Sequence, residues 1–129
     1  MSELYFSCDV ETDGPIPGVY SMLSIGVAIC GRDDGNGFEP LDPELETFYR
    51  ELQPVSERFE PEALAVSGLD RARLAVEGAP PERAMRELDS WVRKEAGGRK
   101  PIFVAYPLGF DWSLFQRGIA AAFQGIKRG

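Results

Sequence analysis

The sequence contains no histidine among its 129 residues. A catalytic mechanism that needs an imidazole as a general base or as a metal ligand is therefore excluded for these residues. Cysteine is also scarce, since Cys8 and Cys30 are the only two. The N-terminus shows no basic segment ahead of an apolar stretch, so no secretory signal is expected. Without one, the two cysteines are more simply reduced thiols than a disulfide.

Basic residues are in the minority, because 14 Lys and Arg stand against 21 Asp and Glu and give a formal charge of −7. This balance disfavours a protein that coats duplex nucleic acid. It does not disfavour an enzyme that binds phosphates through divalent metals, because such a centre is built from carboxylates. No apolar run approaches the ~20 residues that a bilayer requires. We therefore expect a cytoplasmic protein without membrane contact.

The residues that are present fit one globular domain over 1–129. The chain weighs 14.3 kDa and is 43% hydrophobic and 27% charged, which excludes wholesale disorder. A domain of this size buries roughly two-thirds of the surface of its unfolded chain. The sequence therefore supports a real hydrophobic core.

A strand, a long loop and a second strand open the chain, which predicts an antiparallel hairpin. Residues 4–11 are rich in β-branched and aromatic side chains that alternate between two faces. The loop over 12–18 contains two prolines and two glycines, so it cannot continue the ladder. The second strand is expected over 20–30. Residues 31–43 are polar and turn-rich, which indicates a solvent-exposed excursion.

A third strand is expected over 46–52. Helices and then a last strand follow it along the chain. Helices are predicted over 61–67 and from Pro80-Pro81 up to Gly97-Gly98, each with proline at its start and glycine beyond its end. The continuous apolar run over 102–106 is typical of a strand covered on both faces. Residues 110–123 carry aromatic side chains at helical spacing. This order predicts an α/β layer structure with a mixed sheet.

Asp9 and Glu11 stand two residues apart on the first strand, so their carboxylates project from the same face. Spacing alone leaves two interpretations open. The pair is either a solvated or arginine-paired strand face, or a pair of hard oxygen ligands for Mg²⁺ or Mn²⁺. Asp111 follows the last apolar strand and lies in the first turn of a predicted helix. This context favours the metal site.

At these residues the chain resembles the DEDD-type (DEDDh-like) 3′–5′ exonucleases, a branch of the ribonuclease-H-like fold. Asp9-Val10-Glu11-Thr12 matches the first motif of the family, D-x-E-T, and Phe110-Asp111 matches the second. Between them, residues 63–69 resemble the segment that runs from a short helix into a Gly-Leu turn. The resemblance implies a ribonuclease-H-like mixed β-sheet flanked by helices, with a shortened C-terminal part.

The third motif of the family, a histidine or tyrosine followed by a fourth aspartate, has no match. Asp111 is the last residue with a carboxylate side chain. We therefore expect a single exonuclease-like domain over 1–129 that is incomplete at its C-terminus. An absent general base and an absent metal ligand predict a weakened metal site and impaired hydrolysis.

The resemblance also implies roles for the three carboxylates that are present. Asp9, Glu11 and Asp111 are expected to be the catalytic residues and to hold two Mg²⁺ or Mn²⁺ ions, with Asp9 bridging both. The expected substrate is single-stranded DNA or RNA with a 3′ end.

The loop after the first strand is expected to contact the terminal nucleotide. The expected contacts are Thr12, the backbone amides of Asp13 and Gly14, and the apolar side chains of Ile16 and Met22. For Ile16, packing of the loop onto the core is an equal alternative. Arginines such as Arg71 and Arg73 are interpreted as solvated helix faces, with phosphate contact as the alternative.

Three functions therefore stay open. The first is a metal-dependent 3′–5′ exonuclease that hydrolyses phosphodiester bonds, impaired in this chain. The second is an inactive relative that binds nucleic acid or a protein, and the third is an acidic α/β interaction domain with surface carboxylates. Helices missing from the C-terminal side would expose an apolar face, which favours a second copy or a partner chain.

Overall fold

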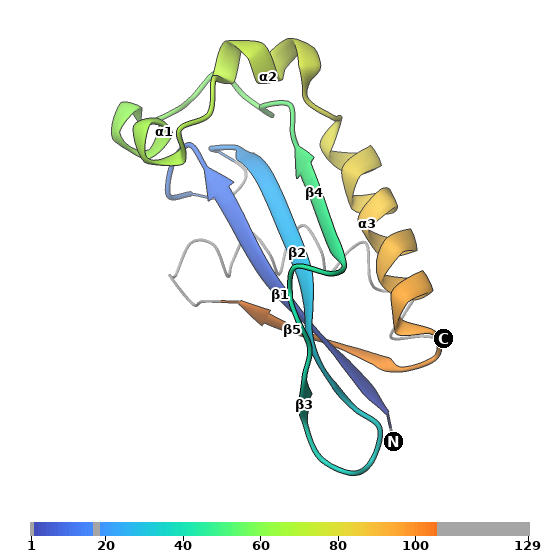
Figure 1. Ribbon diagram of the computed structural model, residues 1–129. Coiled ribbons are helices and arrows are strands. Elements are labelled where there is room, and N and C mark those ends of the chain that lie inside the picture. The colour runs from blue at the N-terminus through green and yellow to red at the C-terminus, as the bar shows by residue number, and fades with distance from the viewer. Residues whose placement is uncertain (1, 17–18, 106–129) are drawn as a thin grey trace.

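The computed structural model describes residues 2–16 and 19–105, which form a mixed sheet with the helix over 81–96 along it and two shorter helices at one end (Figure 1). The mixed α/β architecture predicted from the sequence is confirmed. In chain order the elements are β1 (Glu3–Thr12), β2 (Met22–Asp33), β3 (Glu39–Pro40), β4 (Thr47–Glu51), α1 (Pro61–Ser67), α2 (Arg71–Glu77), α3 (Pro81–Ala96) and β5 (Lys100–Ala105).

β1 is a central strand of the sheet, with β2 on one side and β5 on the other. β1 pairs antiparallel with β2, as the sequence predicts, and its parallel pairing with β5 makes the sheet mixed. β3 and β4 both pair with β2. Asp9 lies opposite Gly26 and Glu11 opposite Ser24, and the register shifts between Glu11 and Thr12. The first motif therefore lies where the central strand ends in an irregularity.

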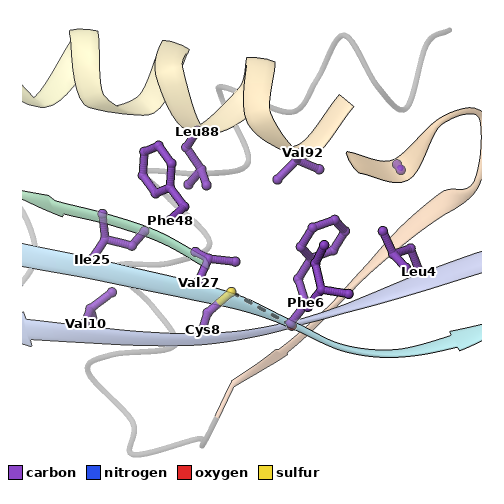
Figure 2. Packing of buried hydrophobic residues seen from close by; sticks show 11 residues of the cluster. Leu4, Phe6, Cys8, Val10, Ile25, Val27, Phe48, Leu88 and Val92 are labelled. Atoms are coloured by element: carbon purple, nitrogen blue, oxygen red, sulfur yellow. Dashed lines mark hydrogen bonds between the residues drawn. The ribbon is translucent and has the colours of Figure 1, made fainter. Parts of the chain in front are cut away.

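The hydrophobic core lies between the sheet and α3 (Figure 2). The ring of Phe6 is fully buried, stacks on Phe103 at a centroid distance of 5.4 Å and meets the edge of Trp91 at 5.7 Å. The predicted alternation of β1 is confirmed, because every second residue from Leu4 to Val10 is buried. The labelled core residues come from β1, β2, β4 and α3: Leu4, Phe6, Cys8, Val10, Ile25, Val27, Phe48, Leu88 and Val92.

The ends of α1 and α3 confirm the helix signals in the sequence. Both helices begin with proline in the first turn, where its missing N–H costs no hydrogen bond. Both end at a glycine in the left-handed conformation, Gly68 with φ 70° and Gly97 with φ 57°. Within the described residues, no helix is long and apolar enough to cross a membrane.

Three details differ from the prediction. β2 continues to Asp33, and residues 39–40 pair with it as β3, so the excursion after residue 31 is partly strand. α2 was not predicted, because Leu74 is its one buried residue and no apolar stripe marks it. β5 is an edge strand of the described sheet with Val104 49% exposed, so its apolar run is not covered on both faces.

Both cysteines are free, as expected from the sequence. Burial raises the pKa of Cys8 well above its usual range, and the neighbouring Cys30 adds to the rise. A higher pKa means a smaller thiolate fraction at a given pH, and the thiolate is the reactive form. We therefore expect iodoacetamide near neutral pH to modify Cys8 only as fast as the domain unfolds. Peptide mass mapping of native and urea-unfolded protein checks this, and equal rates in both would contradict the burial of Cys8.

Candidate active site

Asp9 and Glu11 project from the face of β1 that points away from the core. Their neighbours Cys8 and Val10 are buried at 8% and 6% exposure, whereas Asp9 is exposed and Glu11 half-buried. The strand period of two therefore places both carboxylates on one accessible face of a central strand. Two carboxylates in this arrangement are hard oxygen donors of the kind that Mg²⁺ and Mn²⁺ prefer.

Asp111, the third expected ligand, lies outside the described residues, and so does the helix predicted over 110–123. Within residues 2–16 and 19–105, no group of three or more acidic, histidine or cysteine side chains is placed to hold a metal ion. The convergence of Asp9, Glu11 and Asp111 therefore stays a prediction. The donor chemistry of Asp9 and Glu11 fits a divalent metal, and the third ligand has to come from elsewhere.

The loop from Asp13 to Ser21 follows the two carboxylates directly. Thr12 pairs with Met22 at the end of the β1–β2 ladder, and Met22 packs half-buried against the core. Gly14 is buried beneath the ring of Tyr20, where an added Cβ would lie 2.2 Å from a ring carbon. Ile16 is 53% exposed. An exposed apolar side chain near the end of β1 suits the predicted contact with a base, whereas Met22 belongs mostly to the core.

Asp13 has a different place from the one predicted. Its side chain is fully buried, and its backbone N–H, expected to bind a 3′ end, donates instead to the carbonyl of Ser21 at 3.1 Å. The amide of Asp13 is therefore already used within the chain. Of the two predicted amide contacts, that of Gly14 stays a prediction.

Arg71 is not the solvated helix residue that its sequence context indicates. Its side chain is 18% exposed, and its Nε donates to Asp13 Oδ2 at 2.9 Å. By contrast, Arg73 is exposed and pairs with Glu51 and Glu77. Sequence reasoning missed the Asp13–Arg71 pair, because the two residues are 58 positions apart and neither lies in a periodic apolar pattern.

The comparisons with known proteins agree with the predicted family. No family model matches the chain. The chain is 40% identical over 113 residues to an Escherichia coli protein named 3′–5′ DNA exonuclease Cap18. The aligned region covers 87% of this chain and 54% of that protein. The chain thus spans about half the length of this curated relative.

Solved structures of exonuclease I are similar in fold. A product-bound exonuclease I superimposes with a TM-score of 0.62 at 14% identity, over 95% of this chain and 26% of that one. A metal-free complex of Escherichia coli exonuclease I with single-stranded DNA gives 0.61 at 14%, over 94% and 24% of the two chains. At these identities the likeness shows the ribonuclease-H-like fold alone. The chain is thus similar over most of its length to a 3′–5′ DNA exonuclease and shares the fold of exonuclease I, in agreement with the resemblance of its motifs to the DEDD-type 3′–5′ exonucleases.

Proposed function

We propose that this chain is the nuclease domain of an enzyme that removes nucleotides from the 3′ end of single-stranded DNA. The observation that carries the proposal is the D-x-E-T motif, with Asp9 and Glu11 side by side on the accessible face of the central strand. DNA is preferred to RNA because the curated relative is named a DNA exonuclease and a similar structure contains single-stranded DNA.

The proposed site uses Mg²⁺ or Mn²⁺ held by Asp9, Glu11 and Asp111. A pair of such ions, when bound, lowers the pKa of an attacking water and stabilises charge on the phosphate oxygens. The carboxylates of Asp9 and Glu11 would hold these ions from the same face of β1. The loop after β1 contacts the terminal nucleotide through the amide of Gly14 and the side chain of Ile16. Thr12 and Met22 border this contact.

The chain is expected to hydrolyse slowly. It contains no histidine, and no carboxylate side chain follows Asp111. A missing general base lowers a rate by about 10²–10⁴-fold, because the attacking water then gives its proton to solvent. The cytoplasmic location and a covering partner chain or second copy stay predictions from the sequence.

A 5′-labelled single strand tests the proposed function. We expect Mn²⁺ to produce a ladder of products shortened one nucleotide at a time from the 3′ end, at rates below ~1 s⁻¹. The control is the same strand with a 3′ phosphate, which should shorten more slowly. Internal cleavage, shortening from the 5′ end, or an intact strand after prolonged incubation would each contradict the proposal. An intact strand that still binds the protein would favour the inactive binding module.

A further inference from the structure

The base of the loop after β1 is closed by a reciprocal pair of hydrogen bonds. The Asp13 N–H donates to the Ser21 carbonyl at 3.1 Å, and the Ser21 N–H donates to Asp13 Oδ1 at 2.6 Å. Both residues are fully buried. The start and the end of the loop are therefore held against each other directly behind the motif that carries Asp9 and Glu11.

The second oxygen of Asp13 reaches a different part of the chain. Arg71, the first residue of α2, donates to it through Nε and to the Ser56 carbonyl through Nη2. Its guanidinium carbon lies 5.2 Å from the centroid of the Phe59 ring, and the Glu60 N–H donates to the Asp13 carbonyl at 2.7 Å. The end of β1, the segment over 56–60 and the start of α2 thus meet at one buried ion pair.

This arrangement requires both members of the pair. A buried carboxylate without its partner is unfavourable, so Asp13 stays buried only while a cation is held beside it. An arginine suits the place better than a lysine, because its planar fork serves a carboxylate and a carbonyl at once. The position of the loop is therefore coupled to a residue of α2, although α2 carries none of the candidate ligands.

We propose that Asp13 and Arg71 are a positioning pair for residues 13–16 and 19–21 of the loop after β1, and that they set how well the site recognises a 3′ end. The inference rests on the proposed function, because the loop is the proposed contact of the terminal nucleotide. Arg71 does not touch the substrate itself. It fixes Asp13, and Asp13 fixes the first and last residues of the loop that carries Gly14 and Ile16.

The test measures recognition of the strand end rather than turnover. Fluorescence anisotropy gives the Kd of the 129-residue chain for a dye-labelled single strand with a 3′ hydroxyl and for the same strand with a 3′ phosphate. A gel confirms that the strands stay intact. We expect wild type to prefer the hydroxyl end by about tenfold, the effect of one or two hydrogen bonds.

Three variants separate positioning from stability. Arg71→Lys keeps the charge but loses the fork, and we expect the preference for the hydroxyl end to disappear in this variant. The double variant Asp13→Asn with Arg71→Gln removes both charges and should lose the preference too. Arg93→Gln breaks the exposed pair with Asp89 on α3. This control variant should keep the preference for the hydroxyl end. Circular dichroism confirms that each variant is folded.

The outcomes distinguish the two proposals. A wild type without preference for the hydroxyl end would overturn 3′-end recognition, and the positioning role with it. A wild type with the preference, together with a folded Arg71→Lys variant that keeps it, would overturn the positioning role alone. If Arg71→Lys does not fold, the double variant decides. If neither Arg71→Lys nor the double variant folds, the pair serves only to stabilise the fold, and the positioning role is overturned as well.

Discussion

Replacement of Asp9 by Asn is expected to lower 3′-end hydrolysis in Mn²⁺ by at least about 10³-fold, because metal ions supply several kcal/mol of transition-state stabilisation. The amide has nearly the size of the carboxylate but no charge, so the Asp9–Glu11 pair loses one of its two anionic donors. Binding of Mn²⁺ should weaken in parallel. Gel assays of strand shortening and calorimetry with Mn²⁺ measure the two effects.

The matched control is Asp89→Asn, the same change on α3. Asp89 pairs with Arg93 on a helix that packs against the core face of the sheet, away from Asp9. Both activity and Mn²⁺ binding should therefore stay at their wild-type values in this variant. Equal Mn²⁺ binding by wild type and Asp9→Asn would contradict the metal site on β1, even if the fold were intact.

Replacement of Phe6 by Ala is expected to lower the free energy of unfolding by about 3–5 kcal/mol, the usual effect of removing a buried aromatic ring. Phe6 is fully buried and contacts both Trp91 and Phe103, so its loss leaves a cavity between the sheet and α3. Small domains are stable by only about 5–15 kcal/mol, so this variant would be close to unfolding. Urea titration measures the effect.

Phe38→Ala is the control for this prediction. Phe38 is 55% exposed and meets the ring of Tyr5 edge-on at 5.0 Å. Its loss should cost about 1 kcal/mol, the value of an aromatic pair near the surface. An equal loss of stability in the two variants would show that the interface between β1 and α3 is not the centre of the core.

Sequence patterns predicted the parts of the fold in which a period or a terminal signal extends over several residues. The alternation from Leu4 to Val10 and the proline and glycine at the ends of α3 are of this kind. β3 has two residues and α2 has Leu74 as its single buried residue, so neither carries a period. The apolar run of β5 indicated burial on both faces, but an edge strand also tolerates such a run, as Val104 shows.

The candidate site was predictable where the chain itself brings residues together. Asp9 and Glu11 share a face because strand geometry leaves no other arrangement. The place of Asp13 in the same loop predicts that its backbone amide contacts the substrate, and no sequence rule shows that its side chain turns inward. Its inward direction depends on Arg71, and a contact over that sequence separation depends on tertiary structure alone.

The parallel pairing of β1 with β5 has a consequence for synthesis on the ribosome. Glu3 pairs with Lys100 and Cys8 with Ala105, so one edge of the first strand receives its partner only after almost all of the described residues exist. The ribosome adds about 5–20 residues per second, so several seconds pass between the synthesis of β1 and that of β5. During this time the N–H and C=O groups along that edge of β1 are unpaired. The strand that carries Asp9 is thus made first and completed last. During that interval the unpaired edge is a template on which a strand of another nascent chain can pair.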